Sequence, residues 1–304
     1  MYFARRILFL IPLLVVIGFL AFALLHALPG GPFDRERKPA SPEIERNLRA
    51  QYHLDEPVWR QYLRYLGGIL HGNFGPSMKY RNHSVGDVIA EALPVSLTLG
   101  TAAFCFAVGV GIPLGFLTAA RKGRWQDYAG SLAALGVICV PGLVIGPLLV
   151  MFFAIKLRWF PVALWGSPWH AILPTLTLGL YFSGRIARLM HEGMLSVIHS
   201  EFLTTARAKG LGEVAVLVKH AFPIAVLPVL SYAGPMLADV LTGSFIVENL
   251  FQIPGVGVFM VNSALDRDYT MVTGLVLLYA ALLLVLNMVV DFAYGALDPR
   301  VKYE

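Results

Sequence analysis

Charged residues are scarce in this chain of 304 residues, since Asp, Glu, Lys and Arg together make up only 14% of it. An average soluble domain carries about 25% charged residues, so the deficit excludes an ordinary water-soluble globular protein. Hydrophobic residues reach 57% of the chain, and the mean hydropathy is +0.67. The composition therefore predicts an integral membrane protein.

Cysteine is nearly absent as well, and the two cysteines, Cys105 and Cys139, lie inside apolar runs. This number excludes a framework of disulfides, and we expect both to be small packing residues in the core. The formal net charge is +5, but the basic residues are scattered around the ends of apolar runs. The charge therefore does not indicate nucleic-acid binding.

The motifs of several enzyme classes are missing too. His191-Glu192 begins like a zinc-protease helix, but the second histidine is not four residues further on, and His199 lies too far along the chain. The sequence contains neither a Gly-x-Ser-x-Gly elbow nor a Walker phosphate loop. We therefore predict no catalytic residues, no metal ligands and no ATP bound by this chain itself.

What the sequence does contain is a series of long stretches without charge. A transmembrane helix needs about 20 predominantly apolar residues, and six stretches are long enough if one acid, Asp239, is allowed. They are Ile7–Phe33, Ala92–Ala120, Tyr128–Ile155, Trp159–Gly184, His220–Val247 and Tyr269–Val290. The sequence predicts an all-α polytopic membrane protein with six transmembrane helices, the first too long to be a cleaved signal peptide.

The basic residues of the short loops predict the orientation. With six helices, they fall on one side of the membrane at Arg5-Arg6, Arg121–Arg124, 185–219 and Arg300–Lys302. That side is the cytoplasm, so both termini are predicted to be cytoplasmic. The segment 29–91 then lies outside, and at about 60 residues it is long enough for its charges not to decide the orientation.

The segment 30–92 is predicted to be a small helical domain outside the membrane. Ser41-Pro42-Glu43 is a helix-start signal, and a second helix is expected after Asp55-Glu56-Pro57, with Gly72 as its stop. Ser84 is expected to cap a third, short helix, Val85–Glu91. The predicted division is thus 1–29 for the first transmembrane helix, 30–92 for this insertion and 93–304 for a five-helix transmembrane core.

Glycine and proline predict two further features. The pairs Gly111/Gly115 and Gly142/Gly146 are four residues apart within apolar runs, a spacing that lets membrane helices approach closely. Phe251–Gly257, between the fifth and sixth stretches, is rich in both residues. We predict that it forms a tightly turned or re-entrant loop and not a helix.

Asp239 is the one carboxylate well inside an apolar stretch. Because an acid within the membrane is costly, it suggests a functional role by default, such as lining a hydrated path where it would meet a substrate amino group. The alternatives are a structural hydrogen bond to a hydroxyl such as that of Thr242, or simple closeness to a wet vestibule.

Ser200–Pro223 is an island of polar residues between the fourth and fifth stretches. It carries start and stop signals of a helix over 201–210: Ser200 as cap, Glu201 in the first turn, Arg207 and Lys209 in the last turn, and Gly210 as the left-handed residue that ends it.

The same helix is expected to be half apolar, since Phe202, Leu203 and Ala206 share one face. Two interpretations stay open on these residues alone. The helix either fits a socket on another protein or is a connector that lies on the lipid headgroups.

This loop resembles the EAA loop of bacterial ABC importer permeases. The resemblance rests on Thr204-Thr205-Ala206, on Gly210 and on His220-Ala221-Phe222-Pro223. The form of Thr205–Leu211 is typical of peptide permeases. Thr204 and Thr205 replace the glutamate and first alanine of the family, so Glu201 becomes the candidate for the polar contact that the glutamate would make.

Other motifs, in order along nearly the whole chain, resemble the B-type permeases of oligopeptide importers. They are Arg5-Arg6 with Leu28-Pro29-Gly30, Tyr52-His53-Leu54, Gly72-Asn73-Phe74-Gly75-Pro76-Ser77, Ile253-Pro254-Gly255-Val256-Gly257, Arg267-Asp268-Tyr269 and Asp298-Pro299. The resemblance implies the type I ABC importer permease fold in the bacterial plasma membrane, and a coupling loop at 191–223.

The resemblance also implies a function and partners. The chain would take up oligopeptides together with a second, C-type permease, two cytoplasmic ATPase subunits that bind ATP and magnesium, and an external peptide-binding protein. The residues implied in coupling to the ATPase are Glu201, Thr204, Thr205, Ala206, Arg207, Lys209, Gly210, Leu211 and Pro223. Open alternatives are dipeptide, nickel or glutathione as cargo, a proton-driven transporter using Asp239, and a membrane-embedded hydrolase.

Overall fold

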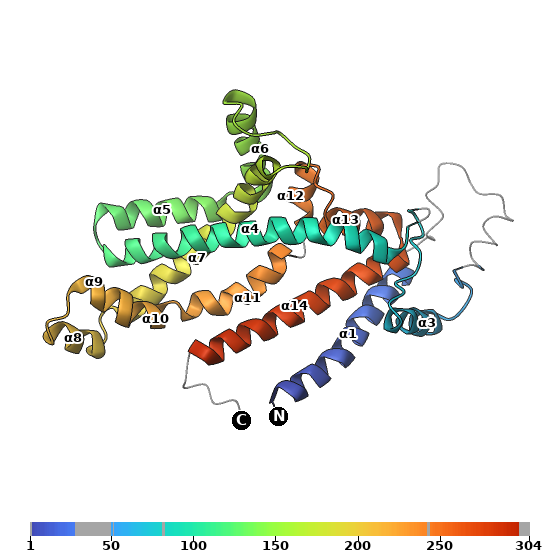
Figure 1. Ribbon diagram of the computed structural model, residues 1–304, viewed down its shortest axis with the longest axis horizontal. Coiled ribbons are helices and arrows are strands. Elements are labelled where there is room, and N and C mark those ends of the chain that lie inside the picture. The colour runs from blue at the N-terminus through green and yellow to red at the C-terminus, as the bar shows by residue number, and fades with distance from the viewer. Residues whose placement is uncertain (1, 28–49, 51, 81–82, 242–243, 298–304) are drawn as a thin grey trace. The chain divides into compact units, whose positions relative to one another are not determined.

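A computed structural model of the chain describes residues 2–27, 50, 52–80, 83–241 and 244–297 (Figure 1). Within these ranges the regular structure is helical, apart from one isolated bridge between Pro76 and Ser84, so the predicted all-α class is confirmed. The elements are α1 Tyr2–Ala27, α3 Val58–Leu70, α4 Val85–Ala120, α5 Trp125–Cys139, α6 Gly142–Leu149, the π-helix η1 Val150–Lys156, α7 Pro168–Val197, α8 Glu201–Ala208, α9 Glu213–Ala215, the π-helix η2 Val216–Ala221, α10 Phe222–Ala225, α11 Leu227–Leu241, α12 Phe245–Leu250, α13 Val256–Asp266 and α14 Tyr269–Leu297.

Four stretches of the described chain are long and apolar enough to cross a membrane, so the predicted count of six is not reached by length and composition. They are Phe9–Ala27, Val85–Ala120, Leu227–Leu250 and Tyr269–Val289. A fifth candidate is the pair formed by α5 and the segment Gly142–Lys156, bent by 103°. The predicted fourth span corresponds to α7, which begins only at Pro168 and is free of charge only as far as Gly184.

The bend in the third predicted span has a local cause. Val140 is extended, with φ −90° and ψ 120°, because the ring of Pro141 disfavours the helical conformation in the preceding residue. Pro141 then becomes the N-cap of α6. The charge-free run that predicts one straight helix is therefore two helices.

Helix boundaries elsewhere confirm some expectations and correct others. The helix expected after Pro57 is α3, and Gly72 follows it with φ +76°. Ser84 does cap a helix, since its hydroxyl accepts from the amide of Asp87 at 3.1 Å. That helix is not short, because α4 continues without a break to Ala120. The helix start expected at Ser41 lies outside the described residues.

Two further expectations from glycine, proline and cysteine need correction. The predicted loop Phe251–Gly257 is non-helical only as far as Gly255, because α13 begins at Val256 and buries that side chain. Cys105 and Cys139 are exposed on the outer faces of α4 and α5, so neither is a core residue of this chain. Apolar residues of a membrane chain need not point inward, since lipid or another subunit can cover them.

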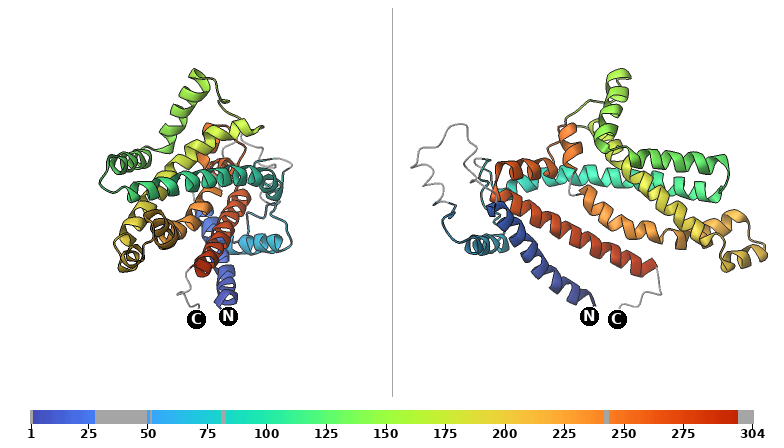
Figure 2. Two further views of the ribbon diagram at one scale, coloured as in Figure 1. Left: turned by 60° about the vertical axis from the view of Figure 1, so that its left-hand side comes forward. Right: turned by 180° about the vertical axis from the view of Figure 1, so that it is seen from behind.

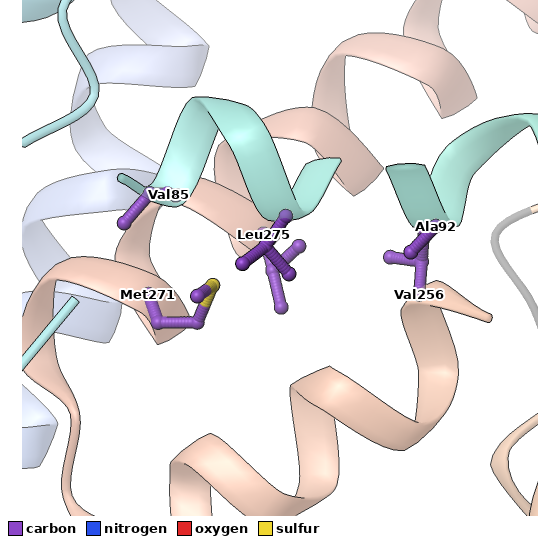
Figure 3. Packing of buried hydrophobic residues seen from close by; sticks show 6 residues of the cluster. Val85, Ala92, Val256, Met271 and Leu275 are labelled. Carbon is purple, nitrogen blue, oxygen red and sulfur yellow. The ribbon is translucent and has the colours of Figure 1, made fainter. Parts of the chain in front are cut away.

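The described helices form two compact units, each with its own packing. The first comprises the described parts of Met1–Val95 and Gly255–Leu284. In one of its clusters the start of α4 meets α13 and α14, through Val85, Ala92, Val256, Met271 and Leu275 (Figure 3). The packing inside this unit therefore joins segments that are more than 160 residues apart in the sequence.

A second cluster of the same unit packs α1 against α3 and the start of α14, through Phe22, Tyr62 and Tyr269. The Tyr62 hydroxyl also donates to the carbonyl oxygen of Val15 at 2.7 Å. Within the insertion after the first helix, α3 is thus attached to α1 by packing and by a hydrogen bond.

Asp268 is a fully buried carboxylate at the start of α14. Five donors lie within 3.3 Å of its two oxygens: the Ser77 and Thr270 hydroxyls and the backbone amides of Met78, Lys79 and Met271. The carboxylate therefore caps α14 and at the same time holds the turn at residues 77–79.

The second unit comprises the described parts of Ser96–Pro254 and Val285–Lys302, and α7 is its central helix. It packs against α5, α6, α10, α11 and α12. Gly111 of α4 lies so close to α7 that an added Cβ would be 2.7 Å from the Ser183 carbonyl oxygen, and Gly115 is similarly close to Ala187. The close helix contact predicted for the first glycine pair is confirmed.

The second glycine pair behaves differently at its two ends. Gly146 lies against Thr177 of α7 and Leu250 of α12, whereas no atom of the described residues lies within 4 Å of a Cβ placed on Gly142. Of this pair, Gly146 alone therefore serves close packing among the residues that the structure describes.

We expect Asp268→Ala to lower the free energy of unfolding by about 2–4 kcal/mol, because it leaves buried donors without their acceptor. Asp266→Ala is the matched control, since Asp266 only pairs with the half-exposed Lys79 and should contribute at most about 1 kcal/mol. Denaturant titration of both variants in mixed micelles measures the difference. Equal losses would contradict the anchoring role of Asp268.

Candidate functional site

The predicted helix at 201–210 is α8. The sequence predicts its C-terminal end correctly but not the capping of its N-terminal end. Gly210 has φ +82°, the left-handed conformation expected of the residue that ends a helix. The side chain of Ser200, by contrast, does not cap the helix, and its buried hydroxyl makes no hydrogen bond within the described residues. The Ser200 carbonyl oxygen instead accepts from the amides of Leu203 and Thr204.

The apolar face of α8 is used inside the chain. α8 packs against η2, and the buried residues of the two segments are Leu203, Ala206, Val216, Leu217 and Ala221. Figures 1 and 2 show α8 folded back beside α9 and η2 at the end of α7. Leu203 and Ala206 are therefore unavailable to lipid, and only Phe202 of the predicted apolar face is exposed.

An ion pair closes this hairpin. The Arg207 guanidinium donates from Nε to Glu213 Oε2 at 3.0 Å and from Nη2 to Oε1 at 2.9 Å. Its third nitrogen, Nη1, donates to the Ile198 carbonyl oxygen at 3.3 Å. A two-pronged pair of this kind fixes orientation as well as distance, so Arg207 joins the end of α7, α8 and the start of α9.

The return from the hairpin to the next helix depends on Pro223. Pro223 has no amide hydrogen to donate to a carbonyl one turn earlier, and the turn before it is the π-helix η2. Pro223 lies in the first turn of α10, which packs on α7, where a Cβ on Gly193 would collide with the Ala225 backbone. The base of the hairpin is thus held by close backbone contact between α7 and α10.

The remaining predicted coupling residues are on the surface of the hairpin. Glu201, Thr204, Thr205, Lys209, Gly210, Leu211 and Pro223 are exposed. The Thr204 and Thr205 hydroxyls donate to backbone carbonyls four residues earlier. On the exposed face of α8, the carboxylate of Glu201 therefore has no hydrogen-bond or ion-pair partner among the described residues.

The hairpin also exposes apolar side chains that the sequence analysis did not single out. Val214 is 77% exposed, and Phe202, Leu211 and Val218 are each more than 40% exposed. Together with the polar face of α8 they form what we term the hairpin surface. Their only signal in the sequence is hydrophobicity inside a polar island.

Asp239 lines a cavity of about 280 Å³ between α6, α7, α11 and α12. The walls of this cavity include Leu143, Tyr181, Phe182 and Ile246. The predicted place of Asp239 inside an apolar helix is confirmed by α11, while its suggested partner Thr242 lies outside the described residues. The acid is thus positioned to face the contents of a cavity.

His191, which begins the zinc-protease-like motif, lies beside an acid of α5. Its Nε2 lies 3.1 Å from Asp127 Oδ1 on α5, close enough for an ion pair when the imidazole is protonated but outside hydrogen-bond geometry. Within the described ranges, no group of three or more His, Cys, Asp or Glu side chains is arranged to hold a metal ion.

The pairing with Arg207 lowers the pKa of the Glu213 carboxyl below its ordinary value. A group with a depressed pKa stabilises the folded state above its unfolded pKa, and the stabilisation is lost as the pH falls through the folded pKa. We therefore expect the hairpin to stay closed from neutral pH down to about pH 5 and to open only in more acidic solution.

The carboxyl chemical shift of Glu213 measures this directly. Its titration midpoint should lie below the ordinary value in the unmodified chain and return to it in Arg207→Gln, while Arg207→Lys should restore part of the shift. An unchanged midpoint in Arg207→Gln would contradict the ion pair.

Known protein families and individual relatives match this chain over nearly its whole length. Residues 111–303 match the family described as binding-protein-dependent transport system inner membrane component, and residues 1–100 match the N-terminal region of such membrane components. The oligopeptide transport system permease protein OppB of Haemophilus influenzae is 42% identical over 302 residues, covering 98% of both chains. The dipeptide transport system permease protein DppB of Bacillus subtilis is 41% identical, covering 99% of this chain and 97% of its own.

Solved structures share the fold. A chain of the MetNI methionine ABC transporter in an inward-facing conformation matches with a TM-score of 0.59 at 15% identity, covering 69% of this chain and 96% of its own. A chain of an amino acid ABC transporter with histidines matches with a TM-score of 0.51 at 16% identity. On the family match and on relatives that are similar over nearly their whole length, this chain belongs to the binding-protein-dependent transport system inner membrane components, as a multi-pass permease of the ABC transporter class.

Proposed function

We propose that this chain is a permease subunit of an ATP-driven importer that takes up oligopeptides. The relatives named for oligopeptide transport, at 41–42% identity over 98% of the chain, support this cargo. Dipeptides are the second candidate, because a dipeptide permease is also 41% identical. The protein would lie in the bacterial plasma membrane with both termini in the cytoplasm, as the distribution of basic residues predicts.

The partners follow from this function. The chain would pair with a second, C-type permease, receive peptide from an external binding protein and bind two cytoplasmic ATPase subunits, which would hold the ATP and magnesium. It would itself have no enzymatic activity. The division into 1–29, 30–92 and 93–304, with a coupling loop at 191–223, is part of the same proposal.

The hairpin surface is the observation that carries the coupling role. Exposed apolar side chains are costly in water unless a partner covers them, and here they lie on a hairpin that the pairing of Arg207 with Glu213 keeps in shape. In our proposal an ATPase subunit covers Phe202, Leu211 and Val214, and Glu201 supplies a polar contact at the edge.

The mechanism we propose is alternating access. Closure of the ATPase dimer on ATP would move the hairpin, and the hairpin would move α7 and the transmembrane helices that pack on it. A ligand shifts a conformational equilibrium only by its different affinity for the two states. The hairpin must therefore stay bound to the ATPase in both states while its orientation changes.

Crosslinking tests the assignment of the partner. Photoreactive residues placed at Phe202, Leu211 and Val214 in native membranes should capture a nucleotide-hydrolysing subunit, and the same label at Leu70, on α3 of the other unit, should not. Reconstituted transporter should then take up peptide only when ATP is supplied. Labels on the hairpin that reach lipid alone, or uptake without ATP, would reject the proposal.

We expect Gly210→Val to uncouple peptide uptake from ATP hydrolysis. A β-branched residue at φ +82° costs at least about 1–2 kcal/mol, so the end of α8 should change conformation although no described residue lies within 4 Å of an added Cβ. Gly212→Val is the matched control, because Gly212 has an ordinary φ of −65° and equally open surroundings.

Both variants should assemble, as judged by co-purification of the subunits. Only Gly210→Val should lose uptake, by about tenfold or more, while it still hydrolyses ATP. Normal uptake by Gly210→Val, or equal loss in Gly212→Val, would contradict the role of the hairpin in coupling.

A further inference from the structure

The cavity that contains Asp239 has a second charged group at its edge. Arg185 follows Tyr181, a wall residue, by one helical turn on α7, and its guanidinium lies 5.2 Å from the centre of the Tyr181 ring. Its Nη1 donates to the Tyr232 hydroxyl of α11 at 3.5 Å. Arg185 also lies within electrostatic reach of Asp239.

The two charges occupy different levels of the helix pair. Tyr232 and Asp239 are seven residues apart on α11, which places them on the same side of that helix and about 10 Å apart along it. Since Arg185 lies at the level of Tyr232 and Tyr181 at that of Asp239, α7 and α11 run in opposite directions here. Asp239 therefore lies in the wall of the cavity, and Arg185 lies just outside it, against the wall residue Tyr181.

We propose that this cavity is a binding site for zwitterionic peptides, in which Asp239 faces the peptide amino group and Arg185 faces its carboxylate. The inference rests on the proposed function and names the residues that would recognise its cargo. The rise of about 10 Å from Asp239 to Tyr232 is the length of about three extended residues, so a short peptide can reach from Asp239 to the place where Arg185 contacts the Tyr232 hydroxyl.

The composition of the walls fits that cargo. Free termini are what all unmodified peptides share, whereas their side chains differ. Apart from Asp239, the wall residues are uncharged, and most are apolar or aromatic, so they can accept side chains of many kinds. A charged terminus loses its hydration on entering such a space, and an opposite charge fixed nearby compensates for the loss. Selection would then act on the ends of the peptide and not on its sequence.

Chemically blocked peptides test this site. The assembled transporter is reconstituted in proteoliposomes, and uptake is measured for trialanine with free termini, with an acetylated amino end or with an amidated carboxyl end. Each peptide is supplied at a concentration that saturates the binding protein. The variants are Asp239→Asn and Arg185→Gln. The controls are Arg188→Gln and Glu192→Gln, whose side chains form an exposed ion pair at 2.9 Å elsewhere on α7.

Asp239→Asn should reduce uptake of free trialanine by about ten- to hundredfold, the value of a hydrogen bond to a charged group, and leave uptake of the acetylated peptide unchanged. Arg185→Gln should reduce uptake of free trialanine by a similar factor and leave uptake of the amidated peptide unchanged. The control variants should take up all three peptides as the unmodified transporter does. A loss of the same factor for all three peptides would overturn the inference, since a purely structural role would produce it.

A second measurement does not depend on how the blocked peptides are delivered. Tripeptides with photoactivatable leucine at the first position should label the segment around Asp239, and those with it at the third position should label Tyr232 and its neighbours. Identical labelling from both positions would overturn the orientation. If the unmodified transporter takes up no peptide, the proposed function itself fails, whereas uptake that both variants leave intact rejects only this site.

Discussion

Close approach between the backbone of α7 and its neighbours is the constraint on which the second unit depends. An added Cβ would lie 2.7 Å from a carbonyl oxygen of α7 at Gly111, and one on Gly184 of α7 would lie 2.8 Å from the Ala134 carbonyl oxygen. Real side chains do not make contacts this short, so α4 and α5 pack on α7 at glycine. In lipid, apolar side chains gain little from facing each other, and such close packing is a main source of helix association.

This packing also connects the two candidate sites. α7 contributes Tyr181 to the cavity wall and carries Arg185 beside that ring, and its C-terminal end leads into the hairpin that Arg207 and Glu213 close. Gly193 holds α10 against the same helix. A displacement of the hairpin is therefore also a displacement of a cavity wall, because one continuous helix carries both. This physical continuity is what an importer driven from the cytoplasm requires.

The sequence predicts well those features that depend on one residue and its own backbone. Gly72 and Gly210 are left-handed where helices end, and Pro57 stands just before a helix that begins at Val58. It predicts poorly what depends on the surroundings. Serine is a residue type that favours the N-cap position, yet the Ser200 hydroxyl accepts no hydrogen bond from the helix. The Ser200 carbonyl oxygen accepts from the amides of Leu203 and Thr204. The apolar run from Tyr128 predicts one helix, whereas Val140 and Pro141 divide it.

Hydropathy, the charges at the ends of apolar runs and the glycine and proline signals determined on their own that the chain is a helical membrane protein with a polar helical segment between two spans. Only the tertiary structure decided that Leu203 and Ala206 face η2, that Glu213 is the partner of Arg207, and that Asp239 lines a cavity beside whose wall residue Tyr181 Arg185 lies. The reason is physical. Helical periodicity tells which residues share a face, but not which other segment that face will meet, because contacts between distant segments depend on how closely two backbones can approach.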